Sequence, residues 1–150
     1  FDGIYGFTPF TPEEMDDFAN RYLYLINPRF IKIFVDENDN AVAMIVAMSD
    51  ISEGIKKSKG HILPFGFIPI LTAGRKSKQL NLLLGAISPD YQGRGLDVMM
   101  GISMLDSARK AGKKVIDSHL ELETNTKVRA EMEKMGGVVY KRYRIYQKKL

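Results

Sequence analysis

The sequence contains no cysteine, which excludes disulfide bonds, thiolate zinc sites and a cysteine nucleophile. We assign no metal site. No apolar run reaches the ~18 residues that a membrane-spanning helix needs, and no signal peptide is visible. A nucleotide-binding P-loop is also excluded, because Gly74-Arg75-Lys76-Ser77 lacks the required residue order and the earlier glycine.

The composition fits one globular domain. The 150 residues can bury a hydrophobic core, and the apolar content of 45% and charged content of 27% are ordinary. The net charge of +4 suits an anionic partner, for which coenzyme A, nucleic acid and an acidic membrane all qualify. We expect a single domain over residues 1–150 in a cytoplasmic protein. Because the chain begins with Phe1, we also expect it to be a processed chain or the C-terminal part of a longer one, truncated at its N-terminus.

Periodicity and turn residues predict an alternating set of elements. Thr11 and Glu14 form a capping-box pattern at the start of the first helix, and the turn residues 36–40 predict a hairpin between the first two strands. The expected helices cover residues 11–26, 95–111 and 125–135, and the expected strands cover residues 30–35, 41–48, 80–87, 114–123 and 138–148.

Residues 51–78 predict no long regular element, because prolines and a glycine interrupt them. Basic stretches flank an apolar segment from Ile62 to Leu71. This segment has two interpretations: it packs against chain outside this sequence, or it lines an acceptor or acyl pocket or rests on a membrane surface.

The most informative stretch runs from Leu82 to Asp97. An apolar strand pattern ends at Pro89, a polar turn with Gly93 and Gly95 follows, and a helical pattern begins at about Leu96. Glycines let the backbone approach a ligand closely, and a helix start offers unpaired N–H donors at the positive end of a dipole. This order of elements predicts a phosphate-binding site.

Two motifs resemble those of the GNAT superfamily of N-acetyltransferases. Pro89-x-Tyr91-Gln92-Gly93-x-Gly95 is similar to the acyl-CoA pyrophosphate loop, and the stretch from Asn125 to Gly136 is similar to the second signature of that family. The Gly-Leu-Asp turn, the Leu-Glu-x-Asn stretch and the ending Tyr-Lys-Arg-Tyr-Arg-Ile-Tyr further resemble a group of bacterial GNAT-like proteins of about twice this length.

The resemblance implies an α/β (α+β) fold with a mixed, mostly antiparallel central sheet flanked by helices, lacking the first strand and helix of the family. It implies an N-acyltransferase that moves an acetyl or similar acyl group from coenzyme A to the amine of a small molecule or peptide. A homodimer or the rest of a longer chain are its expected protein partners. The residues implied in binding acetyl-CoA or CoA are Ile87, Gln92, Gly93, Arg94, Gly95, Leu96, Asp97 and Asn125.

The catalytic groups are less well defined. Glu121 and Glu123 alternate with His119 on the expected fourth strand, so either carboxylate can take the amine proton if this face points to the cleft, and otherwise the face is solvated. Met132 stands where the family has a proton-donating tyrosine. Tyr140, Tyr143 or water then replaces that donor, or transfer is lost and the chain is an inactive module beside an active domain.

Asp97 occupies a position where the family has glycine or alanine. Helical spacing puts it on the apolar side of the helix. Its carboxylate can cap the first-turn N–H groups, modify the CoA site or act directly in catalysis.

Overall fold

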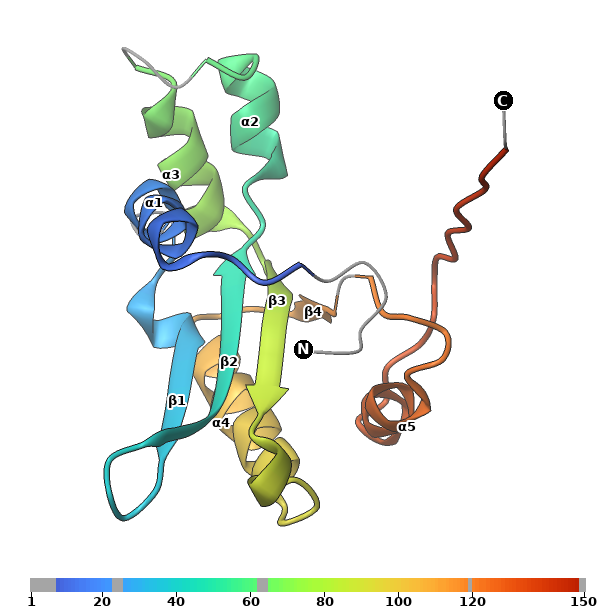
Figure 1. Cartoon of the computed structure of the whole chain (residues 1–150). Helices are drawn as coiled ribbons and strands as arrows, with labels where there is room; N and C mark the ends of the chain where they lie inside the picture. Colours follow the sequence, from blue (N-terminus) through green and yellow to red (C-terminus); the bar gives the residue numbers. More distant parts are fainter. Residues whose placement is uncertain (1–7, 23–25, 62–64, 119, 149–150) are drawn as a thin grey trace. The chain divides into compact units, whose positions relative to one another are not determined.

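The computed structural model describes residues 8–22, 26–61, 65–118 and 120–148. It divides into two compact units, Phe1–His119 and Leu120–Leu150. The first unit contains the sheet and most helices, and the second contains one helix and an extended tail (Figure 1). Each unit is described by itself.

A four-stranded sheet forms the first unit, with its strands in chain order. Three strands pair antiparallel and the last pairs parallel to the third, which confirms the mixed, mostly antiparallel sheet. The strands are β1 (Ile31–Val35), β2 (Ala41–Ser49), β3 (Gln79–Ile87) and β4 (Val115–Asp117).

The described residues also contain five α-helices and two short 3-10 turns. The first helix has the predicted capping box: Thr11 N–H donates to Glu14 Oε2 at 2.9 Å, and Glu14 N–H donates to Thr11 Oγ1 at 3.2 Å. It was expected to reach residue 26, but residues 23–25 lie outside the described part. The elements are α1 (Pro12–Tyr22), η2 (Pro28–Phe30), α2 (Ser52–Ser58), α3 (Phe67–Lys76), η3 (Pro89–Tyr91), α4 (Leu96–Lys110) and α5 (Thr126–Lys134).

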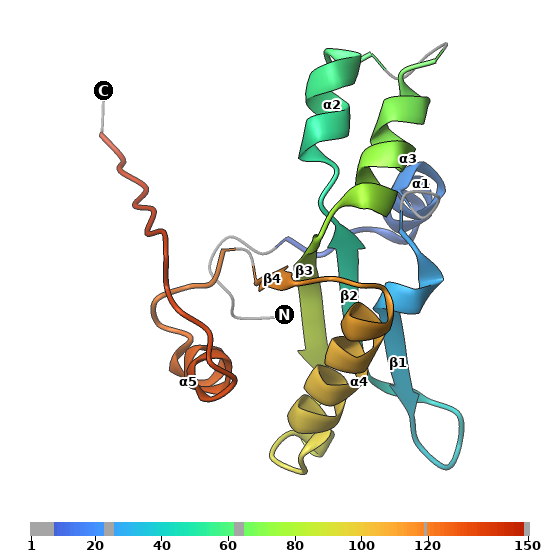
Figure 2. The same cartoon turned by 180° about the vertical axis from the view of Figure 1, so that it is seen from behind.

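The core of the first unit lies between the sheet and α4, which crosses one face of it (Figure 2). Methionine and alanine side chains of α4 meet apolar side chains of η2, β2 and β3, and Leu80 is fully buried. This packing holds the second half of α4 against η2, β2 and the beginning of β3. The buried cluster consists of Phe30, Ala47, Leu80, Met104 and Ala108.

The segment between β2 and β3 is more regular than the sequence predicts, because α2 and α3 form a helical hairpin there. Pro69 lies in the first turn of α3, where a missing N–H costs no intrahelical hydrogen bond. The two helices cross closely at Gly54, which is buried. The apolar segment from Ile62 to Leu71 lies partly outside the described residues, which resume at Phe65.

Two predicted strands are wrong over the described residues. The fourth strand ends at Asp117 instead of continuing to Glu123, and residues 138–148 are extended without forming a strand. His119 lies outside the described part. A strand needs a neighbour for its backbone N–H and C=O groups, and β4 pairs only with the first three residues of β3. Alternating sequence alone cannot supply that neighbour.

Candidate functional site

The predicted strand, glycine turn and helix are confirmed as β3, residues 88–95 and α4. On one side β3 pairs with β2 along most of its length, from Leu80 to Ile87. On the other side it pairs with β4 only from Gln79 to Asn81. The two parallel strands therefore separate, and the second half of β3 has an open edge within the described residues.

The register shows which backbone groups of β3 face this open edge. Ser88 N–H donates to Val42 O across the sheet at 2.8 Å. Because successive residues of a strand point their N–H and C=O groups to opposite sides, those of Gly85 and Ile87 point away from β2. The N–H group of Ile87 therefore points to the open edge of β3, and its role in binding CoA stays a prediction.

The turn after β3 requires glycine at two positions. Gly93 and Gly95 have φ values of +71° and +82°, which side chains other than glycine rarely adopt. A Cβ added at either residue would meet nothing within 4 Å, so the space above both is open. The glycines do not serve packing within the described chain, and their backbones can be approached closely from outside.

The start of α4 presents unused donors to the same space. Its first intrahelical bond runs from Met99 N–H to Gly95 O at 3.1 Å, and its N-cap, Gly95, has no side chain to cap the preceding N–H groups. The backbone N–H groups of Leu96 to Val98 are therefore available to an anion, and the helix dipole adds to the attraction. Asp97 is half-buried, and its carboxylate makes no hydrogen bond with the described residues. The predicted capping role is therefore not seen there.

Three side chains hold the turn in place. Tyr91 Oη donates to Asp36 Oδ2 at 3.2 Å, Gln92 Nε2 donates to Ile87 O at 3.2 Å, and the Arg94 guanidinium lies 5.1 Å from the centre of the Tyr91 ring. The sequence reveals the tyrosine but not its partner, because Asp36 belongs to the β1–β2 turn, far away in the chain. Arg94 is exposed and adds a cation beside the open space.

The contact between Tyr91 and Asp36 affects both acids. Hydrogen bonds from Asn40, above all from its backbone N–H, lower the pKa of Asp36 below its ordinary value. Removal from water, followed by the nearby Asp36 charge, raises the pKa of Tyr91. Tyr91 is therefore a neutral anchor at physiological pH and does not serve as a base.

The remaining predicted site residues belong to the second unit and are described within it. Asn125 caps α5, its side chain accepting from Val128 N–H at 3.4 Å. Glu123 pairs with Arg142 at 2.9 Å, and both side chains are exposed. Glu121 is exposed outside any strand and Tyr143 is 68% exposed. Their catalytic roles stay predictions.

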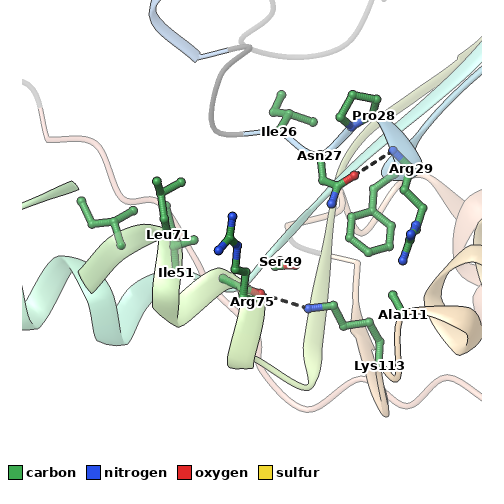
Figure 3. A pocket seen from close by; sticks show the side chains of 13 residues that line it. Ile26, Asn27, Pro28, Arg29, Ser49, Ile51, Leu71, Arg75, Ala111 and Lys113 are labelled. Carbon is green, nitrogen blue, oxygen red and sulfur yellow. Dashed lines mark hydrogen bonds between the residues drawn. The ribbon is translucent and has the colours of Figure 1, made fainter. Parts of the chain in front are cut away.

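A cavity that the sequence does not predict lies at the opposite end of β3 from the loop. It has a volume of about 510 Å³ and is bordered by η2, the end of β2 and the last turns of α3 (Figure 3). Its cationic side chains are Arg29, Arg75 and Lys113, and none of the described residues that line it is a carboxylate. The apolar lining residues are Ile26, Pro28, Phe30, Ile51, Ile70, Leu71 and Ala111.

Lys113 is engaged at the edge of this cavity. Its Nζ donates to Ser77 O at 2.8 Å and to Gly74 O at 3.3 Å, at the C-terminal end of α3 (Figure 3). Burial, followed by the charge of Lys78, lowers the pKa of Lys113. The lysine satisfies the last carbonyl groups of α3, which assigns it a structural role.

Comparison with solved structures identifies the fold. The chain superposes on a Trypanosoma brucei acetyltransferase with a TM-score of 0.54 and 16% identity, over 94% of this chain and 82% of that one. It superposes on an aminoglycoside N-acetyltransferase in complex with CoA with a TM-score of 0.56 and 14% identity, over 92% of this chain and 88% of that one. The chain has the fold of the GNAT acetyltransferases.

Two curated relatives match nearly the whole chain. Protein YghO of Escherichia coli K12 is 28% identical over 155 residues, which cover 97% of this chain and 39% of the relative. A bacterial ceramide synthase of Caulobacter vibrioides is 30% identical over 154 residues, with the same coverage of 97% and 39%. The chain therefore spans about 39% of the length of these relatives. No protein-family model matches the sequence.

Proposed function

We propose that this chain is the acyl-CoA-binding part of an N-acyltransferase, which moves an acyl group from coenzyme A to an amine. One observation carries the proposal: the open edge of β3 leads directly into a turn with two positive-φ glycines at the uncapped start of α4. An acyl-CoA has an extended, partly peptide-like arm that carries the thioester and ends in a pyrophosphate. The arm matches the open strand edge, and the pyrophosphate matches the anion site that follows it. The GNAT fold supports the same assignment.

In this proposal the backbone N–H groups from Gly93 to Asp97 hold the pyrophosphate, since that of Gln92 donates to Pro89 O at 3.2 Å. Arg94 contributes a positive charge from the exposed side of the turn. Asp97 places a carboxylate close to the same anion, so it weakens binding unless a further cation pairs with it. Gly85 offers its outward N–H and C=O groups and Ile87 its outward N–H group to the pantetheine amides, in the manner of an added strand, while Ile87 O accepts from Gln92 Nε2.

The chemistry needs an attacking amine, a polarised thioester and two proton transfers. The amine nitrogen forms a C–N bond to the thioester carbonyl carbon, and the C–S bond breaks. An N–H group at the β3 edge stabilises the negative charge that develops on the carbonyl oxygen. Glu121 or Glu123 accepts the amine proton, and Tyr143 donates a proton to the leaving thiolate, since Met132 cannot.

The acceptor is proposed from the curated relative. A ceramide is the amide of a fatty acid and a long-chain amino alcohol, and the Caulobacter relative is a ceramide synthase. We therefore propose the primary amine of a long-chain amino alcohol as the acceptor and a fatty acyl-CoA as the donor. The aminoglycoside acetyltransferases share only the fold at 14% identity, so their soluble acceptors are the competing class.

A calorimetric titration with CoA tests the binding site. Replacing Gly95 by valine forces a β-branched residue into a left-handed conformation and fills the space above the turn, so CoA affinity should fall at least tenfold. Gly60 is a matched control, because it also has a positive φ (+79°) and open space around it but lies in the α2–α3 hairpin. Equal affinities of the Gly95→Val variant and the wild type would refute the site.

A turnover assay then tests the acceptor. The chain, and the full-length protein where it is longer, is incubated with palmitoyl-CoA and sphinganine, or with acetyl-CoA and an aminoglycoside. Release of free thiol with sphinganine alone supports the proposed acceptor class. Release with the aminoglycoside alone contradicts it but leaves the CoA site intact.

A second function is favoured by Met132. This half-buried residue of α5 occupies the position of the family's proton donor and cannot donate a proton. The chain would then bind an acyl-CoA or assemble beside an active domain without catalysing transfer. Tight CoA binding without turnover in the full-length protein, unchanged when Met132 is replaced by tyrosine, would support this function.

A further inference from the structure

The α2–α3 hairpin is inserted where the sheet does not require it. β2 and β3 are antiparallel neighbours, which a turn of two residues can connect. Residues 50–78 instead form two helices that project beyond the end of the sheet, at the top of the view in Figure 1. The connection is thus far longer than topology demands.

The hairpin keeps its small residues inside and its large apolar residues outside. Gly54 of α2 packs directly against the backbone of Ile70 and Pro69 on α3. Helical spacing turns Ile68 and Leu71 of α3 away from this contact, and they are 50% and 43% exposed. Phe67, at the start of α3, is 42% exposed. Phe65, just before α3, is 71% exposed. Phe65, Phe67 and Ile68 are the exposed apolar residues nearest to the tip of the hairpin, and we call them the tip patch; Leu71, further along α3, borders the cavity described above.

The charge around the tip patch has one sign. Between Glu53 and Asp90 the sequence contains six lysines and arginines and no carboxylate, whereas the whole chain has a net charge of only +4. Lys56, Lys57 and Lys59 are exposed in and after the last turn of α2, at the tip. Exposed aromatic and aliphatic residues beside lysines are the composition of helices that lie in the interface of an anionic membrane.

Another exposed apolar surface of the chain lacks this charge pattern. On α4, Val98 and Ile102 are 59% and 62% exposed, but Asp106 is on the same helix and pairs with Lys110 at 2.7 Å. The hairpin also has an ion pair, between Glu53 and Lys56 at 2.9 Å, but its exposed Lys57 and Lys59 make no ion pair with the described residues. On α4, the two carboxylates Asp97 and Asp106 balance Arg109 and Lys110. The excess of positive charge, and not the lack of an ion pair, therefore distinguishes the hairpin from α4. None of the helices among the described residues is long and apolar enough to cross a bilayer.

We propose that the α2–α3 hairpin docks onto an anionic lipid surface, with the tip patch inserted among the headgroups and the lysines of α2 against the phosphates. The contact holds the domain at the membrane without spanning it. Its basis is the charge and exposure of the hairpin, so it stands independently of the proposed acyl transfer.

Tryptophan fluorescence tests insertion directly, because the chain contains no tryptophan. The Phe67→Trp variant places a single reporter in the tip patch, and Tyr143→Trp places a control reporter at another exposed aromatic position. With phosphatidylcholine vesicles that contain phosphatidylglycerol, we expect a blue shift for Phe67→Trp alone. Vesicles of phosphatidylcholine alone should give no shift. The proposal is overturned if the fluorescence of Tyr143→Trp alone shifts, or if the fluorescence of neither variant shifts.

Vesicle flotation tests the apolar and the electrostatic part of the contact separately. Ile68→Glu should reduce binding at least tenfold, and the double reversal Lys56→Glu and Lys57→Glu should reduce it further, at about fivefold or more per lysine. The matched controls are Ile102→Glu on α4, and Lys127→Glu with Lys134→Glu on α5. Both substituted hairpin surfaces are exposed, and circular dichroism verifies that each variant folds.

The alternative occupant of the tip patch is protein. Sedimentation without vesicles distinguishes a lipid from a protein occupant. If the protein self-associates, if Ile68→Glu abolishes this self-association, and if the protein does not bind vesicles, the lipid proposal is overturned. Equal loss of vesicle binding in Ile102→Glu and Ile68→Glu also overturns it. Because no acyl donor is present in any of these assays, failure of the proposed acyltransferase activity leaves their result unchanged.

Discussion

Replacing Gly54 by alanine should separate the helices of the α2–α3 hairpin. A Cβ at this position would lie 2.5 Å from Ile70 Cα, 2.6 Å from Pro69 O and 2.9 Å from Ile70 N. All three atoms belong to the backbone of α3, so no side chain can rotate to relieve the contact. The helices must move apart, and Ile70, which is 8% exposed, loses part of its packing.

The magnitude follows from opposing effects. Alanine favours a helix over glycine by up to about 1 kcal/mol, while a steric overlap in a packed interior costs about 1–3 kcal/mol and more when backbone must move. We therefore expect the unfolding free energy to fall by about 2 kcal/mol. For a unit of this size, this corresponds to a decrease in Tm of roughly 6–10 °C.

Urea unfolding and thermal melting followed by circular dichroism measure this change. Gly74→Ala is the matched control within the same hairpin, because its Cβ would meet the Ile51 Cγ2 side-chain atom at 3.3 Å, which can adjust. We expect Gly74→Ala to change stability by less than about 1 kcal/mol. A Gly54→Ala variant as stable as the wild type would show that the helices do not cross as described.

Three further predictions concern the turn and the end of α3. Tyr91→Phe removes the hydrogen bond to Asp36, so amide hydrogen exchange over residues 92–95 should accelerate, whereas Tyr143→Phe should leave it unchanged. Because Asn40 lowers the pKa of Asp36, this carboxylate stabilises the fold fully above its unfolded pKa of about 3.9 and loses that effect as the pH falls. Urea unfolding at several pH values should therefore show the wild type more stable than Asp36→Asn at neutral pH, with the difference vanishing in acid. Lys113→Met keeps the apolar stem but leaves two α3 carbonyl groups without their cation, so the unfolding free energy should fall by about 1 kcal/mol. A stability equal to the wild type would contradict the structural role of Lys113.

Local patterns predicted much of the first unit. The hairpin over residues 36–40, the strand ending at Ile87 and the helix beginning at Leu96 were recognisable, because each depends on neighbouring residues: Asx turns, apolar alternation and glycine. Residues 138–148 show the limit of this reasoning. Their alternating aromatics suit a strand, but the described residues provide no backbone partner.

The sequence alone determined that a glycine turn joins an apolar strand to a helix, since the positive φ at positions 93 and 95 favours glycine locally. Only the tertiary structure decided which edge of β3 stays open, because strand pairing joins residues far apart in the chain. The Tyr91–Asp36 contact and the close crossing at Gly54 likewise join segments that no local pattern connects. Local conformational preferences act within a few residues, whereas the faces of a site are formed by packing between residues far apart in the chain.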